Sequence, residues 1–193
     1  MKKILIATSN QHKVEEFRHI LKDSDIELIS LKELDDHNEV VEDGKTFQEN
    51  SYLKAKFYHD LYHLPTMADD SGISISYLSN YPNIHSSRFM EHLGEKRRNQ
   101  LITEIMKDVT DRRAFFTTVI TYIDDEKTLT FEGIYSGEIA QKPEGEGGFG
   151  YDPIFYVKEM GKTMGVLGNA YKDQHSHRAI ALRKVREYFE SNS

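Results

Sequence analysis

The sequence predicts an α/β fold, and three stretches of the chain carry that prediction. Residues 2–31 place an apolar run, an amphipathic segment and a second apolar run in succession, which is typical of a βαβ unit. Residues 113–140 are rich in aromatic and β-branched side chains and are broken by four charged residues, as in a β-hairpin. Residues 176–189 predict a C-terminal helix. The length of 193 residues suits one domain, which we expect over residues 1–193.

The first three elements are predicted from the spacing of apolar residues and from the turn-forming residues between them. The run "KKILIATSN" is a short apolar segment that ends in turn residues, so we expect a strand followed by a loop. The segment 11–23 predicts a helix, and "IELISL" predicts the second strand. The apolar positions that recur at helical spacing in the first helix are Val14, Phe17, Ile20 and Leu21.

A second helix is predicted to begin at Thr46. Glu49 follows three residues later, which is the spacing of a capping box. We expect the buried stripe of this helix to include Phe47, Leu53 and Phe57.

The remaining elements are assigned in the same way. We expect a strand within 66–72, a loop over 78–89, a helix over 95–109 through Leu101, Ile102 and Ile105, the hairpin, and a polar loop that leads to the final helix.

Composition excludes several classes of protein. The chain contains no cysteine, which rules out disulfides and thiolate metal sites and favours hard metals bound by oxygen. The net charge of −7 argues against binding to a nucleic acid polymer. No apolar run is long enough to cross a membrane, and the N-terminus turns polar too early for a secretory signal, so we expect a cytoplasmic protein.

Two stretches near the first and third strands point to phosphate and metal chemistry. The loop "TSNQHK" joins a strand to a helix, where backbone amides and Lys13 can hold an anion, although an ordinary polar turn is the commoner explanation. Asp69 and Asp70 end a strand and can bind Mg²⁺ or orient a water, with Glu42 as a candidate third carboxylate. The alternative for the pair is a turn cap that uses Asp70.

Two later stretches suit a nucleotide. The segment "GEGGFGYDPIF" combines glycines, which permit close approach, with Phe149, Tyr151 and Asp152, which can contact a nucleobase. The segment "KDQHSHR" places Lys172, His177 and Arg178 around a helix start. A flexible hairpin loop and a solvated basic face, respectively, are the alternatives.

Taken in order, these motifs resemble the inosine triphosphate pyrophosphatase family. The resemblance runs from Lys3 to the last helix and is carried by "TSNQHK", "EDGKTFQEN", "ADDSG", "DRRAFF", "GFGYDPIF" and "SHR". It implies an elongated mixed β-sheet with flanking helices in two lobes, an active site in the cleft between them, and a homodimer. The implied activity is Mg²⁺-dependent hydrolysis of purine nucleoside triphosphates such as ITP, dITP and XTP to the monophosphate and pyrophosphate.

The resemblance also assigns roles to residues. Asp70 is implied as the catalytic carboxylate, with Asp69 beside it, and Asp70 and Glu42 as metal ligands. The implied substrate-binding residues are Thr8, Ser9, Asn10, Gln11, His12, Lys13, Ser71, Phe149, Gly150, Tyr151, Asp152, Lys172, His177 and Arg178.

The chain departs from the family pattern at Val41, Ser76, Asn80, Asn83 and Asp173, which bears on loop shape and substrate range. Two other functions therefore stay open: a pyrophosphatase for other modified nucleotides, and a nucleotide-binding module that has lost catalysis.

Overall fold

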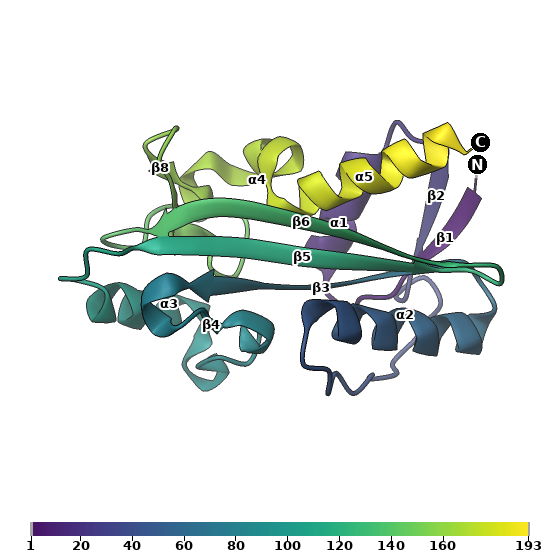
Figure 1. The fold of residues 1–193 in the computed structure, drawn as a ribbon, viewed down its shortest axis with the longest axis horizontal. Helices are drawn as coiled ribbons and strands as arrows, with labels where there is room; N and C mark the ends of the chain where they lie inside the picture. Colours follow the sequence, from purple (N-terminus) through teal and green to yellow (C-terminus); the bar gives the residue numbers. More distant parts are fainter. Residues whose placement is uncertain (1, 193) are drawn as a thin grey trace. The chain divides into compact units, whose positions relative to one another are not determined.

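The computed structural model describes residues 2–192, which contain both strands and helices (Figure 1). The predicted α/β class is confirmed. The helices are α1 (Gln11–Leu21), α2 (Phe47–Tyr62), α3 (Gly94–Ile105), α4 (Met164–His175) and α5 (His177–Ser191). The strands are β1 (Lys2–Ile6), β2 (Ile26–Ser30), β3 (Thr66–Ile75), β4 (Tyr81–Pro82), β5 (Arg113–Ile123), β6 (Thr128–Ile139), β7 (Phe155–Val157) and β8 (Lys162–Thr163).

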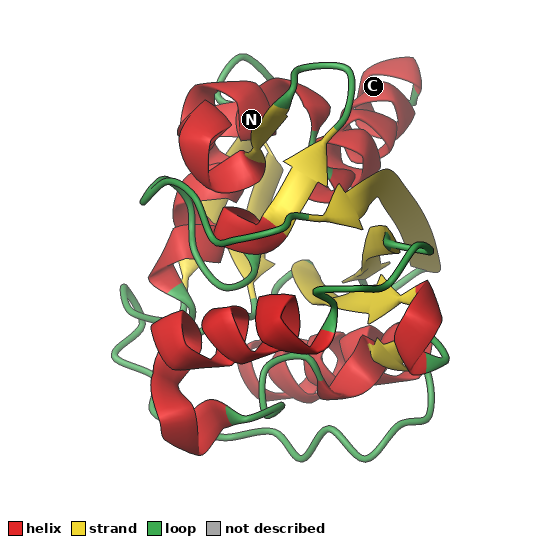
Figure 2. Ribbon diagram, turned by 90° about the vertical axis from the view of Figure 1, so that its left-hand side faces the viewer, coloured by secondary structure: helices red, strands yellow, loops and turns green. Residues whose placement is uncertain are grey.

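The strands form one mixed sheet, shown in yellow among the red helices in Figure 2. Its order is β2-β1-β3-β5-β6-β7-β8, and β4 pairs with β3. β1 is parallel to both β2 and β3, as the predicted βαβ opening requires, whereas β7 pairs antiparallel with β6 and β8. No helix within residues 2–192 is long and apolar enough to cross a membrane.

Contacts divide the chain into two compact units. Unit 1 consists of Met1–Asp70, Thr118–Gly133 and Arg178–Ser193, and unit 2 consists of Ser71–Thr117 and Ile134–His177. Strands β3, β5 and β6 contribute residues to both.

The core of unit 1 has two layers because β1 is covered on both faces. Ile4 and Ile6 pack with apolar residues of α1 and α5, whereas Leu5 and Ala7 pack with α2. Successive strand residues point to opposite faces, so a strand covered on both sides is apolar throughout. Figure 1 shows α1 and α5 on one side of β1 and β3, and α2 on the other.

Helix α2 corrects the predicted buried stripe. Phe47 is buried as expected, but Phe57 is 38% exposed and Leu53 is only half-buried. The buried face carries polar groups that have partners, because Asn50 donates to Asp70 and Ser51 bonds to Thr121. Hydrophobic periodicity cannot find a face that is buried through hydrogen bonds. The other buried residues of the helix are Ala55 and Tyr58.

In unit 2, a helix replaces the expected polar loop before the last helix. The core joins Ile73 of β3, Ile102 of α3 and Phe155 of β7. Helix α4 follows β8 directly, and non-helical backbone at Gly168 (φ +73°) interrupts it. This glycine hides the helical period in the sequence.

Candidate active site

The adjacent aspartates of β3 contact different helices of unit 1. Lys13 Nζ of α1 lies 2.9 Å from Asp69 Oδ2, and Arg178 Nη2 of α5 lies 3.3 Å from the same atom. Asp70 instead contacts α2, where Asn50 Nδ2 donates to its Oδ2 at 3.2 Å. Because side chains alternate along a strand, the two like charges point to opposite faces and meet separate partners.

Asp69 is ionised despite its burial. Burial alone would raise its pKa, but the charges of Lys13 and then Arg178 outweigh that effect and hold the pKa of Asp69 well below its usual range. The Lys13 side chain is only 14% exposed, and burial lowers its pKa although Asp69 acts in the opposite direction. The charge of Asp69 is thus balanced by protein cations.

Arg178 links Asp69 to a second carboxylate that sequence reasoning missed. Its Nη1 donates to Glu16 Oε2, and both side chains are buried. We call Lys13, Glu16, Asp69 and Arg178 the charge network. A buried guanidinium between two carboxylates is held in one orientation. Glu16 could have been found from its place between the buried positions Val14 and Phe17, where a carboxylate needs a partner.

Asp70 has different electrostatics. Burial raises the pKa of Asp70 to about 6; Lys54 opposes this shift, and the charge of Glu42 adds to it. Lys54 Nζ donates to Asp69 O at 2.6 Å and lies 3.3 Å from Glu42 Oε1. Lys54 thus lies beside Glu42, and the charges of both side chains act on Asp70.

The carboxylates near Lys54 suit a hard divalent cation that takes most of its ligands from outside the chain. Residues 2–192 contain no cluster of three or more His, Asp or Glu side chains that could hold a metal alone. Mg²⁺ commonly binds one or two carboxylates and completes its shell with water and substrate phosphates. Asp70 and Glu42 supply such a pair, and a cation between them would relieve the unfavourable charge of Asp70.

The predicted phosphate loop forms the N-terminus of α1. Asn10 is the N-cap, and its Oδ1 accepts from His12 N at 3.0 Å, while Asn10 N donates to Thr8 Oγ1 at 3.2 Å. None of the described residues in the first turn of α1 is acidic. The positive end of the helix is therefore open to an anion. The loop brings together Thr8, Ser9, Asn10, Gln11, His12 and Lys13.

Two further residues were missed on α2. Asn50 and Lys54 lie four positions apart, and both contact the aspartates of β3. Their signal in the sequence is a pair of polar side chains on the helical face that begins with Phe47.

In unit 2, an ion pair holds the segment of residues 145–155 that is expected to contact the nucleobase. We call this segment the base loop. Asp152 Oδ2 accepts from Lys172 Nζ at 2.8 Å and from Phe149 N at 2.9 Å. The Lys172 ammonium also lies 4.5 Å from the centroid of the Phe149 ring. Gly148 has φ +71°, and a Cβ there would fall 2.0 Å from Asp152 Oδ2, so only glycine fits.

The two aromatic residues of this loop are not equivalent. Tyr151 is 6% exposed, its hydroxyl donates to Ser86 O at 2.5 Å, and burial raises its pKa to about 12. Phe149 is half-buried. The Tyr151 ring therefore belongs to the core, and Phe149 is the ring that can stack on a ligand.

The other predicted residues of unit 2 lie in regular structure. His177 is 6% exposed and stacks on Phe116 with ring centroids 4.8 Å apart. Ser71 is a half-buried residue of β3. The residues predicted to contact the substrate are thus divided between the units, and Arg178 belongs to unit 1.

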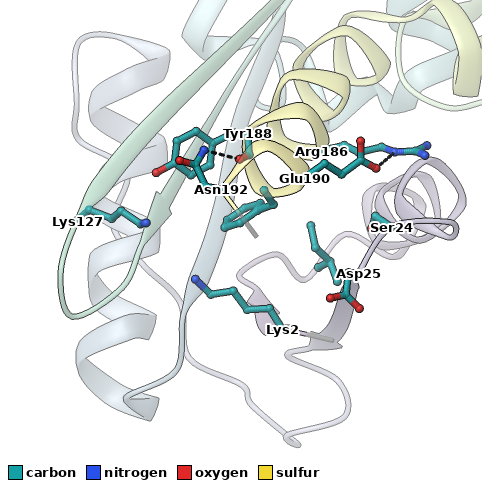
Figure 3. Close-up of a pocket in the computed structure, with 10 residues that line it drawn as sticks. Lys2, Ser24, Asp25, Lys127, Arg186, Tyr188, Glu190 and Asn192 are labelled. Atoms are coloured by element: carbon teal, nitrogen blue, oxygen red, sulfur yellow. Dashed lines mark hydrogen bonds and ion pairs between the residues drawn. The ribbon is translucent and has the colours of Figure 1, made fainter.

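A pocket of about 230 Å³ lies elsewhere in unit 1 (Figure 3). It is lined by residues of β1, the β5–β6 hairpin and the end of α5, among them Lys2, Lys127 and Tyr188. Figure 3 shows Arg186 turned toward Glu190, its ion-pair partner at 2.6 Å. Its lining contains none of the predicted site residues.

Comparisons with known proteins place this geometry in context. A family model described as the Ham1 family matches residues 4–188. The chain is 40% identical over 193 residues to a Staphylococcus epidermidis protein named dITP/XTP pyrophosphatase, covering 98% of this chain and 97% of that one. A Porphyromonas gingivalis protein with the same name is 38% identical over 190 residues, with 97% of each chain covered.

Two solved structures of Ham1 proteins are also similar to this chain. The Ham1 protein of Staphylococcus aureus matches with a TM-score of 0.88 at 38% identity and 100% coverage of both chains. A HAM1 protein from Coxiella burnetii matches with a TM-score of 0.89 at 35% identity, covering 99% of this chain and 100% of the other.

Proposed function

Because the chain belongs to the Ham1 family, we propose that it is a nucleoside triphosphate pyrophosphatase. It hydrolyses ITP, dITP and XTP to the monophosphate and pyrophosphate and so removes deaminated purines from the nucleotide pool. The observation that carries this proposal is the pair of environments on β3: Asp69 is balanced by Lys13 and Arg178, whereas Asp70 is a carboxylate whose charge is disfavoured. The names of the relatives support it.

The residues of unit 1 are proposed to act on the triphosphate. Thr8 to Lys13 bind phosphate oxygens through the amides at the start of α1 and the Lys13 ammonium, and Ser71, the first residue of unit 2, adds a hydroxyl. Asp70 and Glu42 hold Mg²⁺, which when bound supplies positive charge to the phosphate oxygens. Asp69 holds Lys13 in position.

The proposed reaction is hydrolysis at the α-phosphorus. A water oxygen bonds to that phosphorus, and the bond to the oxygen bridging the α- and β-phosphates breaks. Pyrophosphate leaves, and the proton of the water passes to a carboxylate, for which Asp70 is the candidate. Asn50 keeps Asp70 in one rotamer through its hydrogen bond.

Base choice is proposed to depend on residues of unit 2. Phe149 stacks on the base, and Lys172 and His177 donate to the oxygen at its six-position. ATP presents an amino donor at that position, and a site built around an acceptor can reject such a ligand by up to roughly 10⁴-fold. The resemblance also assigns Arg178 to the nucleotide, but its bonds to Glu16 and Asp69 favour a role in orienting Asp69.

The test is pyrophosphate release by the purified protein from ITP, dITP, XTP, GTP, ATP and a modified pyrimidine triphosphate. We expect kcat/KM to be far higher for ITP, dITP and XTP than for ATP, and activity to disappear with EDTA. Comparable values for ATP and ITP would contradict the proposed selectivity. Preference for the pyrimidine would favour the second candidate substrate class, and selective binding without release would favour a binding module.

The resemblance also implies assembly, and we propose that the protein is a homodimer. Sedimentation equilibrium should give twice the chain mass. A mass equal to one chain at micromolar concentration would exclude a stable dimer.

A further inference from the structure

Helix α3 holds both polar groups of a single residue in the base loop. Glu95 Oε2 accepts from Gly150 N at 3.0 Å, and Asn99 Nδ2 donates to Gly150 O at 2.9 Å. Glu95 and Asn99 lie four positions apart, on one face of the helix. Gly150 has φ +65°, where a side chain would be strained, although nothing lies within 4 Å of the position of a Cβ.

The neighbours of this residue are fixed as well. Phe149 N donates to Asp152, and the Tyr151 hydroxyl donates to Ser86 O. The guanidinium of Arg98, also on α3, lies 3.8 Å from the centroid of the Tyr151 ring and is 4% exposed. Three consecutive residues of a loop rich in glycine are therefore each tied to a different part of unit 2.

From these contacts we propose that Glu95 and Asn99 are positioning residues that determine base selectivity. They hold the peptide groups of Gly150 and so fix the place and orientation of the Phe149 ring that precedes it. The inference rests on the proposed function, because it assigns Phe149 to the base.

The physical reason is conformational entropy. Glycines give a loop many backbone conformations, and each released residue regains freedom that binding must remove again. A stacked ring and a donor discriminate between bases only while their geometry is held within a fraction of an ångström. Release of Gly150 should therefore weaken base recognition and leave the phosphate chemistry unchanged.

The first experiment compares variants of α3. Glu95→Ala removes the acceptor, whereas Glu95→Gln retains one. Asn99→Asp replaces the donor by a carboxylate at nearly constant shape. Glu104→Ala is the matched control, because Glu104 lies on the same helix and contacts Arg97 at 3.2 Å, not the loop. Asn99 is 2% exposed, so Tm is measured for every variant, and the Glu95 series alone decides the result if Asn99→Asp does not fold.

We expect the KM for ITP to rise about three- to ten-fold in Glu95→Ala and Asn99→Asp, as for the loss of one hydrogen bond. The kcat should stay near wild type, and the ratio of kcat/KM for ITP over ATP should fall. Glu95→Gln and Glu104→Ala should match wild type. An unchanged ratio in a folded Glu95→Ala protein that hydrolyses ITP would overturn the inference and leave the proposed function intact.

Two readouts without turnover separate this inference from the function. By NMR, exchange of the Gly150 amide in the ligand-free protein should be faster in Glu95→Ala and unchanged in Glu95→Gln; equal exchange in all variants would refute the contact. Calorimetry should show that wild type prefers IMP to AMP and that Glu95→Ala loses part of this preference. If wild type has the preference but releases no pyrophosphate, the proposed function fails while the inference stands.

Discussion

The buried charges of the two units rest on different kinds of backbone. In unit 1, the charge network projects from α1, β3 and α5, and each member is held by a regular element. In unit 2, the ion pair of Asp152 and Lys172 also binds the amide of Phe149 in a loop that needs glycine at 148. Charges on rigid elements suit a ligand that is itself highly charged. An ion pair that holds a loop in one conformation suits recognition of a ligand by its shape, because it fixes the surface that the loop presents to the ligand.

The largest effect should come from Asp70, which stands beside the charge network but is not balanced by it. We expect Asp70→Asn to lower kcat by about 10²- to 10⁴-fold, the usual contribution of a positioned general base. The variant should fold and be more stable at pH 7 by roughly 1 to 3 kcal/mol, because burial disfavours the charge that the substitution removes. Pyrophosphate assays and urea unfolding check both statements. Near-wild-type turnover in the folded variant would remove Asp70 from the mechanism.

Removal of one buried cation from each unit tests whether the charge network and the Asp152–Lys172 pair contribute differently to stability. Arg178→Met removes a cation from two buried carboxylates, Glu16 and Asp69, of which Asp69 keeps Lys13, and should cost about 3 to 5 kcal/mol of unfolding free energy. Lys172→Met removes a cation from one, Asp152, which keeps the amide bond from Phe149, and should cost less. Urea unfolding at pH 7 measures both. Equal losses of unfolding free energy in the two variants would mean that the contact of Arg178 with a second carboxylate adds nothing to stability.

Substitution of Lys13 tests whether the charge network contributes to binding of the triphosphate. We expect Lys13→Ala to weaken binding of a non-hydrolysable ITP analogue by about 10- to 100-fold, as for a lost hydrogen bond to a charged group, and binding of IMP by much less. Calorimetry gives the two dissociation constants. Equal losses for both ligands would place Lys13 away from the phosphate tail.

Asp124, a carboxylate of unit 1 that is not part of the charge network, should give the smallest effect and serves as a baseline. At the β5–β6 turn, burial would raise the pKa of Asp124, but bonds from Tyr122 and from the amides of Glu126 and Lys127 outweigh it and lower the pKa from 3.8 to about 2. A lowered pKa stabilises the fold above pH 3.8, and this contribution is lost as the pH falls through 2. Asp124→Asn should cost about 1 to 2 kcal/mol at pH 7.

Urea titrations from pH 7 to pH 3 check this baseline. The gap between wild type and Asp124→Asn should narrow below pH 4. A gap that stays constant over that range would show that the charge of Asp124 does not stabilise the turn.

Local patterns predicted the elements that local forces determine. Thr46 caps α2 as expected, since its Oγ1 accepts from Glu49 N at 3.1 Å, and the hairpin breaks at 124–127 between β5 and β6. The predicted helical face of α1 is largely confirmed, with Val14, Phe17 and Leu21 buried. These features depend on neighbours within a few residues, so periodicity and capping chemistry reveal them.

The motifs determined the family, which the Ham1 model confirms, and the roles of the site residues remain predictions. Sequence order could not show which aspartate of "ADDSG" meets which charges. That depends on partners up to 109 residues away, such as Arg178 for Asp69, and on the alternation of side chains in a strand that only the sheet places between α1 and α2. For Glu16, Asn50 and Lys54 it offered only a weak signal, a polar side chain on a helical face that is otherwise apolar, because side chains satisfied by hydrogen bonds and charge leave no hydrophobic pattern. The sequence by itself thus determined which charged and polar side chains are available. The tertiary structure decided which of these charges are neutralised by a partner, because that depends on distance and burial.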